Sequence, residues 1–342
     1  MKKLRACLLI SLLAASEAFV HRLSRSRVFG RLHPLHIGFM DYSPLGPEIF
    51  DDIDVAGCQI AKDKEYLNAI LKEWNKEDRS FEIESKPFEY KDEEKGNLFG
   101  HLVRRKKSEP AEEKSLPGIL LFHTGAGPLD VFLFHKADSL VQKYDCVVLI
   151  CDIVSDCYGW AWSPDGTWYT DIRNSLLEND AQLLRSRATS AANGIGVGAP
   201  EVDPQRLAAL GWCLGGQPIL ELGRVTSAAF DVRAMATFHG VFDRDVPITM
   251  LKDEVSSTKS GGTVLISNGK DDPMVDDEDL KCTKTVFEKS GWVVEIEEYE
   301  DTKHGFSNPA QALSEKAAFG YNEGAARKSW DATLQLLENH IF

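Results

Sequence analysis

A cysteine flanked by glycines stands where a predicted strand passes into a predicted helix. The segment Gly211-Trp212-Cys213-Leu214-Gly215-Gly216 follows the apolar strand predicted over residues 206–210. Glycines two residues before and after Cys213 allow a sharp turn that holds the thiol above the sheet in a strained backbone. The helix N-terminus favours a thiolate, and the N–H of Leu214 can stabilise an oxyanion. The pattern predicts a nucleophilic cysteine; taken alone, it also fits a buried structural cysteine.

A carboxylate and a histidine follow later predicted strands in the order that nucleophilic catalysis needs. Asp271 and Asp272 come after the strand 264–266, and His304 comes after the strand that ends at Tyr299. The carboxyl ends of parallel strands meet at one edge of a sheet, so these side chains should converge there. The chain order nucleophile, acid, histidine is that of α/β-hydrolases. The spacing before Pro273 favours Asp272 as the acid, with Asp271 as the alternative.

A second glycine-rich turn, His123-Thr124-Gly125-Ala126-Gly127, follows the apolar strand that ends at Phe122. It lacks the Lys-Ser/Thr pair and the spacing of a phosphate-binding P-loop. We interpret it as an oxyanion loop in which Gly125 offers a backbone N–H. A tight strand-to-helix turn without a catalytic role is the alternative.

These motifs resemble the dienelactone hydrolase family of α/β-hydrolases, over a stretch from about Tyr90 to Leu337. The pieces that carry the resemblance are Pro117-Gly118 with the strand ending at Phe122-His123, the G-x-C-x-G-G turn around Cys213, the G-x-x-D-P-x-V motif from Gly269, and His304-Gly305-Phe306 followed by Asn308-Pro309. The resemblance implies hydrolysis of esters or lactones through an acyl-enzyme, without a metal or organic cofactor. It implies Cys213 as nucleophile, His304 as base and Asp272 as orienting acid.

The sequence departs from the family pattern at two positions that bear on the substrate. The prototype enzymes have a Glu, which interacts with the resting cysteine, where this chain has Thr124. They also hold a substrate carboxylate with arginines, one of them four residues after the histidine, where this chain has Asn308. A carboxylate-bearing substrate is therefore in doubt. Arg173, Arg185 or Arg187 could supply a positive charge, or could be ordinary arginines of a helix surface.

An aromatic segment follows another predicted strand, at a place where hydrolases insert pocket walls. Its aromatic residues are Tyr158, Trp160, Trp162, Trp168 and Tyr169. We expect Trp160, Trp162 and Trp168, together with Thr124 and Arg173, to line the substrate pocket; the alternative is that the aromatic residues cap the sheet. Cys151 and Cys157 have no matching His/Cys pair for a zinc site. No metal site is predicted.

Alternating strand and helix signals indicate one α/β domain over residues 81–342. Near-continuous apolar runs predict strands at 118–122, 147–150, 207–210, 234–238, 264–266 and 293–299 that are buried on both faces. Helices are predicted near 130–144, 173–193, 214–228, 276–290 and 323–340. We expect an α/β-hydrolase fold, with a mostly parallel sheet between two helical layers. An N-terminal antiparallel hairpin (81–90 and 98–103) should join its edge. Residues 41–80 form an extension with one amphipathic helix, near 59–76.

Composition and the N-terminus bear on partners and localisation. The chain has 342 residues and a net charge of -14, so it has no electrostatic reason to bind nucleic acid or anionic lipid. Residues 1–18 have the three-part form of a signal peptide, and residues 19–40 are rich in Arg and Ser and contain no acid, like a transit peptide. This leader resembles that of proteins targeted to secondary plastids; secretion is the alternative. No membrane insertion is expected after its removal, and the oligomeric state is open.

Three functions are compatible with these residues. The first is a cysteine-dependent hydrolase that acts on a small-molecule ester or lactone. The second is a binding protein that keeps the fold without activity, because a fold does not guarantee chemistry. The third is an acyltransferase that passes the same acyl-enzyme to an acceptor other than water. The reactivity of the Cys213 thiol distinguishes the first from the second, since only a tuned thiol alkylates fast below neutral pH.

Overall fold

A computed structural model describes residues 40–42, 64–74, 81–92, 96–106, 115–154, 167–225, 227–243 and 262–342. The predicted leader, apart from Met40, lies outside these residues, so signal and transit functions stay predictions. Most of the extension before Lys64 and the aromatic residues 155–166 also lie outside them. Within the described part of the chain, no helix combines the length and the apolar character needed to cross a membrane.

A nine-stranded sheet, counted over the described residues, forms the centre of the compact unit that spans 39–342. Its strands lie in the order β1-β2-β3-β5-β4-β6-β7-β8-β9. Their bounds are β1 Met40–Tyr42, β2 Ile83–Lys91, β3 Asn97–Arg105, β4 Leu116–Phe122, β5 Val147–Cys151, β6 Val202–Trp212, β7 Val232–Phe238, β8 Thr263–Gly269 and β9 Val293–Tyr299. All strand pairs from β5 to β9 in this order are parallel, and β1, β2 and β3 join antiparallel. The predicted fold class and hairpin are confirmed.

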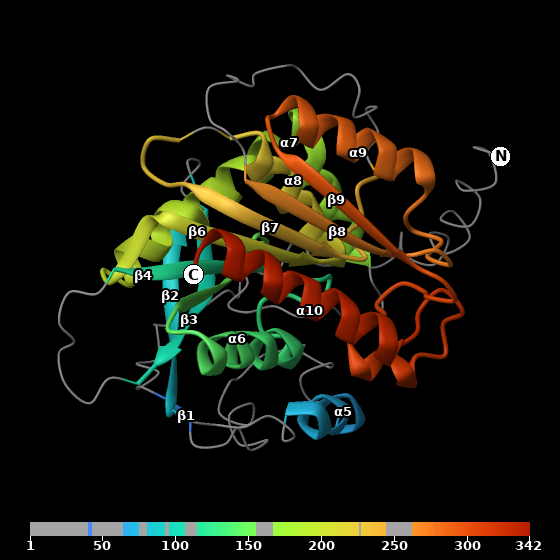
Figure 1. Ribbon diagram of the computed structural model, residues 1–342, viewed down its shortest axis with the longest axis horizontal. Helices are drawn as coiled ribbons and strands as arrows, with labels where there is room; N and C mark the ends of the chain where they lie inside the picture. Colours follow the sequence, from blue (N-terminus) through green and yellow to red (C-terminus); the bar gives the residue numbers. More distant parts are fainter. Residues whose placement is uncertain are drawn as a thin grey trace, which may run out of the picture. The chain divides into compact units, whose positions relative to one another are not determined.

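Helices cover both faces of the sheet (Figure 1). Their bounds are α5 Lys64–Trp74, α6 Val131–Lys143, α7 Thr167–Gly198, α8 Gly216–Gly223, α9 Asp277–Lys289 and α10 Glu323–His340. Side chains of α5, α6 and α10 share one hydrophobic core with one face of the sheet, and those of α7, α8 and α9 share a second core with the other face. The central strands β4 to β8 are therefore apolar on both sides, which explains why their runs do not alternate.

The last strand, β9, differs from the prediction that it is buried on both faces. Val293 is exposed, and the other residues of β9 are exposed or half-buried. The physical reason is its place in the sheet, since β9 pairs only with β8 and forms the edge of the described sheet. Edge strands face solvent and tolerate charges, which agrees with the glutamates of this strand.

Helix α5, from the predicted extension, packs onto the domain. Ile70 and Trp74 are fully buried, and the Trp74 indole donates a hydrogen bond to Asp138 of α6. The hydroxyl of Tyr66 donates to Asp130 Oδ1 at 2.9 Å and accepts from the Asn308 amide at 2.8 Å. Because Asp130 is the N-cap of α6, this hydroxyl joins α6 to the segment that follows His304.

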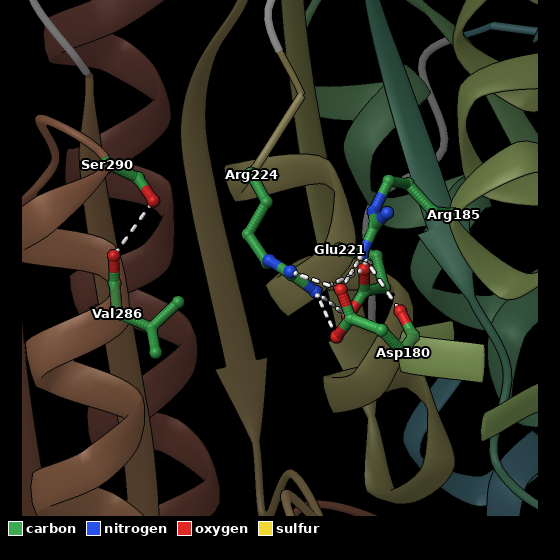
Figure 2. A network of polar contacts seen from close by, with 6 residues as sticks. All are labelled: Asp180, Arg185, Glu221, Arg224, Val286 and Ser290. Carbon is green, nitrogen blue, oxygen red and sulfur yellow. Dashed lines mark hydrogen bonds and ion pairs between the residues drawn. The ribbon is translucent and has the colours of Figure 1, made fainter. Parts of the chain in front are cut away.

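Helix α7 contains a sharp break that the sequence pattern did not predict. Residues 179–181 have positive φ angles of 51°, 60° and 54°, although none of them is glycine. Figure 2 shows the charged side chains gathered at this break. Asp180 pairs with Arg185 and Arg224, and both arginines also pair with the fully buried carboxylate of Glu221 on α8. These ion pairs hold the break against α8.

Candidate active site

The turn between β6 and α8 presents Cys213 at the carboxyl edge of the sheet. Cys213 has a φ of 54°, a left-handed conformation that L-residues adopt rarely and at a cost. The backbone around it is closely packed. A Cβ atom on Gly211 would lie 2.2 Å from the carbonyl oxygen of Gly215, and one on Gly215 would lie 2.4 Å from that of Phe122. Both glycines are therefore required by close backbone approach.

The Cys213 thiol lies among groups that favour its ionised form. Burial alone raises the pKa of this thiol, but the neighbouring His304 and the backbone N–H groups of Leu214 and Gly125 outweigh burial and lower the pKa. The structure thus brings to one sulfur both N–H groups that the sequence predicted for an oxyanion hole.

His304 lies between Cys213 and Asp272. Its Nδ1 donates to Asp272 Oδ2 at 2.8 Å, and its buried Nε2 interacts with the Cys213 thiol and has no other partner among the described residues. Of the two candidate acids, Asp272 is buried and Asp271 is exposed. The second oxygen of Asp272 accepts from the backbone N–H of Met274 at 2.8 Å, which fixes the carboxylate.

The environment of His304 favours the imidazolium. Burial lowers the pKa of His304, but the thiolate of Cys213 and the hydrogen bond to Asp272 outweigh it and raise the pKa to about 10. The backbone on both sides is held, since His304 N–H donates to the Ala318 carbonyl and Gly320 N–H donates to the His304 carbonyl, each at 3.1 Å. A thiolate–imidazolium pair with an orienting carboxylate is the state that this geometry supports.

The turn after β4 is organised by Thr124. Its hydroxyl accepts from Ala126 N–H at 3.0 Å, and its carbonyl accepts from Gly127 N–H at 3.2 Å. Thr124 therefore folds the loop that directs the Gly125 N–H toward the sulfur. In this chain the residue that replaces the prototype glutamate acts on the loop through its hydroxyl.

The predicted cationic residues are all engaged with acids. Arg173 Nη2 pairs with Asp243 Oδ1 at 2.5 Å and also donates to the Asp243 carbonyl. Arg185 belongs to the ion-pair network at the break in α7. Arg187 is buried, pairs with Asp92 at 3.0 Å and donates to two backbone carbonyls of the segment after β5.

The aromatic part of the predicted pocket lies outside what the structure describes. Trp160 and Trp162 fall in residues 155–166, and the side chain of Trp168 lies outside the described atoms although its backbone begins α7. Asn308 is engaged by the N–H of Ala310 and by Tyr66, so its amide serves the fold. Within the described ranges, no group of three or more His, Cys, Asp or Glu side chains could hold a metal ion.

One residue of the site was missed by the sequence analysis. His239 follows β7, is 2% exposed, and packs its ring edge-to-face against His304 with centroids 4.7 Å apart. The signal was available, because a His-Gly pair stands directly after the apolar strand 234–238, at the same edge as the other site residues.

Comparison with known proteins agrees with this geometry. Residues 170–341, half of the chain, match the model of the dienelactone hydrolase family. An uncharacterised protein of Caenorhabditis elegans, K02A2.1, is 28% identical over 159 residues, covering 45% of this chain and 92% of that protein. Among solved structures, m3DLH superposes with a TM-score of 0.62 at 24% identity, over 76% of this chain and 99% of its own.

A second solved structure has a similar fold. It is the dienelactone hydrolase-like promiscuous phosphotriesterase P91 from metagenomic libraries, with a TM-score of 0.59 at 24% identity, over 76% of this chain and 99% of its own. At these identities the structural similarity shows that the folds are alike, whereas the match to the family model shows which family the chain belongs to. The chain belongs to the dienelactone hydrolase family of ester-bond hydrolases.

Proposed function

We propose that this protein hydrolyses small esters or lactones through a covalent thioester on Cys213. The observation that carries the proposal is the arrangement around one sulfur. His304 and two backbone N–H groups interact with the thiol and lower its pKa, and His304 is oriented by Asp272 at 2.8 Å. A nucleophile, a base and an orienting acid are the parts that acyl transfer requires.

Acylation proceeds by attack of the Cys213 thiolate on the substrate carbonyl carbon. The new C–S bond moves the carbonyl electron pair onto oxygen, and the N–H groups of Leu214 and Gly125 bind this oxyanion. When the oxyanion collapses, the C–O bond of the ester breaks. The imidazolium of His304 gives its Nε2 proton to the leaving alkoxide, which departs as an alcohol.

Deacylation uses the same groups in reverse. Neutral His304 takes a proton from water, and the resulting hydroxide attacks the thioester carbonyl. Collapse of this second oxyanion breaks the C–S bond, releases the carboxylic acid and restores the thiolate beside the imidazolium. Asp272 keeps the ring oriented in both half-reactions and does not itself need to take the proton.

We further propose that the preferred substrates carry no carboxylate. Arg173 pairs with Asp243, Arg185 with Asp180 and Glu221, and Arg187 with Asp92. An arginine whose charge is already compensated gives little extra binding to a second carboxylate. A neutral ester should therefore exceed its acyl-chain carboxylate analogue by about tenfold or more in kcat/KM, a difference of about 1.4 kcal/mol. Equal values would contradict this part of the proposal.

The main test is hydrolysis of p-nitrophenyl acetate and butyrate by the protein and by Cys213→Ala. We expect the substitution to lower kcat by about 1000-fold or more, because the nucleophile of a triad acts as a unit with its base. Cys282→Ala is the matched control, since Cys282 lies on α9 away from the site and should be replaceable without loss. Wild-type turnover that survives Cys213→Ala would refute the thioester mechanism.

The pH profile gives a second readout. The active thiolate–imidazolium pair exists between the lowered pKa of Cys213 and the raised pKa of His304. We expect activity to fall at low pH as the thiolate gains a proton, and at high pH as His304 loses the proton that it gives to the leaving group. In His304→Gln, alkylation of Cys213 should need a higher pH, because burial then raises the thiol pKa unopposed by the imidazolium.

A further inference from the structure

His239 occupies a strained position between the turn that carries Cys213 and the loop that carries His304. It has a φ of 43°, in the left-handed region where histidine and asparagine are among the more tolerant residues. Its N–H donates to the Ser267 carbonyl of β8 at 2.8 Å, and two residues later Val241 N–H donates to the Cys213 carbonyl at 3.0 Å. The backbone of residues 239–241 therefore fixes the ring of His239 relative to Cys213.

The side chain of His239 contacts the loop that carries His304. Its Nε2 forms a hydrogen bond with Ser307 Oγ at 3.2 Å, and its ring packs edge-to-face on Phe306 with centroids 5.5 Å apart. The same ring meets His304 at 4.7 Å with an interplanar angle of 67°. Its Nδ1 is buried and has no hydrogen-bond partner within the described part of the chain. The ring thus contacts His304 directly and hydrogen-bonds only to Ser307 among the described residues.

His239 stays neutral in this environment. Burial first, and the positive charge of His304 second, lower the pKa of His239 well below its ordinary value. The groups that face it are His304, Ser307 and Phe306, so the charge within its reach is the imidazolium. A neutral ring can pack against the imidazolium without repelling it, whereas a second imidazolium would repel it.

We propose that His239 is a positioning residue whose neutral ring holds the His304 imidazolium in line between Cys213 and Asp272. This inference rests on the proposed function, because it assigns a task within the same site. The bonds of His304 to Cys213 and Asp272 lie along the ring plane and leave its tilt free. The edge-to-face contacts with His239, and with Phe319 at 5.1 Å, restrict that tilt.

The test is the pH dependence of Cys213 alkylation by iodoacetamide, followed by mass spectrometry of the Cys213 peptide in the full chain. His239→Asn keeps a residue that tolerates positive φ and can bond Ser307, but it removes the ring. We expect it to raise the apparent pKa of Cys213 alkylation by about one pH unit, which is about tenfold less thiolate at pH values below that pKa. His239→Phe restores a ring and should stay within about threefold of wild type in alkylation rate at such a pH.

Ester hydrolysis supplies the second readout. For His239→Asn we expect kcat to fall about tenfold while KM changes less than about twofold, because alignment of the imidazolium matters after the substrate is bound. His101→Asn is the matched control, since His101 also packs its half-buried ring edge-to-face, on Phe134 at 5.2 Å, away from the site. It should leave the thiol pKa unchanged.

The outcomes separate this inference from the proposed function. If His239→Asn folds with wild-type circular dichroism and keeps the wild-type alkylation profile, His239 does not position His304. If His239→Phe is impaired as strongly as His239→Asn, a ring at this position does not restore the alignment of His304, and the inference is wrong. A protein that alkylates as expected in all variants but hydrolyses no ester would support the positioning role and contradict the hydrolase proposal.

Discussion

Two of the segments that hold residues other than glycine in the left-handed region, the turn at Cys213 and the break in α7, are held in different ways. At the turn between β6 and α8, Cys213 is fixed by backbone packing. Gly211 and Gly215 stand where the backbone of another residue leaves no room for a Cβ atom. At the break in α7, residues 179–181 are fixed by ion pairs from Asp180 to Arg185 and Arg224. Steric packing therefore maintains the strained backbone at Cys213, and ion pairs maintain it at residues 179–181.

The difference teaches what each segment can tolerate. Steric packing places an atom to within a fraction of an ångström and does not depend on salt or pH, which suits the nucleophilic role proposed for Cys213. Ion pairs hold a segment more loosely, and their strength depends on burial and ionisation. We therefore expect substitutions at the turn to cost most, and relief of strain at the break to be tolerated or favourable.

The largest effect is expected for Gly211→Ala. The new Cβ would lie 2.2 Å from the Gly215 carbonyl oxygen, so the turn must move. We expect a loss of about 3 kcal/mol or more in the free energy of unfolding, together with loss of fast Cys213 alkylation. Urea unfolding measures the first quantity. Gly196→Ala is the control, because nothing lies within 4 Å of its Cβ and a helical alanine should stabilise α7 by up to about 1 kcal/mol.

A smaller but still large effect is expected for Glu221→Gln. Glu221 is fully buried against Arg185 and Arg224, so neutralising it removes the buried partner of both guanidinium groups and leaves them Asp180 alone. We expect about 2–4 kcal/mol of destabilisation in urea unfolding at neutral pH. Glu288→Gln, which removes the exposed partner of Lys284, should lower the free energy of unfolding by less than about 0.5 kcal/mol. Equal costs for the two substitutions would mean that charge does not hold the break.

The smallest effect, and one of opposite sign, is expected for Ala181→Gly. Ala181 is fully buried with a φ of 54°, a conformation that glycine adopts without strain. We expect stabilisation by about 0.5–1 kcal/mol. Ala188→Gly, in the regular part of the same helix and equally buried, should instead destabilise by about 1 kcal/mol. Thermal unfolding of the pair measures both, and destabilisation of similar size in both would show that residue 181 is not strained.

Much of the fold followed from the sequence because buried parallel strands and amphipathic helices leave strong local signals. The strand at 293–299 and the helix at 323–340 have the predicted bounds. The break in α7 left no such signal, because Asp180 is stabilised by Arg224 more than forty residues later. The exposure of β9 was also mispredicted, since a run of residues does not show that a strand will lie at an edge.

The site was predictable only in part for the same reason. The residues around Cys213 and His304 were predicted because each stands in a short sequence motif whose residue types indicate its chemistry. The pairing of Arg173 on α7 with Asp243, and the contact of His239 with His304, bring together residues that are far apart in the sequence. Such contacts depend on the register of neighbouring strands, which one sequence does not reveal. The catalytic roles themselves await the tests above.

The hydroxyl of Tyr66 has a consequence for how fragments of this protein should be designed for expression. It bridges the N-cap of α6 and the loop after His304, and Trp74 of the same helix is fully buried. A fragment trimmed to begin at β2 would lack Trp74 and expose the apolar surface that this side chain covers. It would also remove the Tyr66 hydroxyl that Asn308 binds, and this would loosen the loop that carries His304. We expect such fragments to aggregate on purification, whereas those that begin ahead of Lys64 keep the loop that carries His304 anchored.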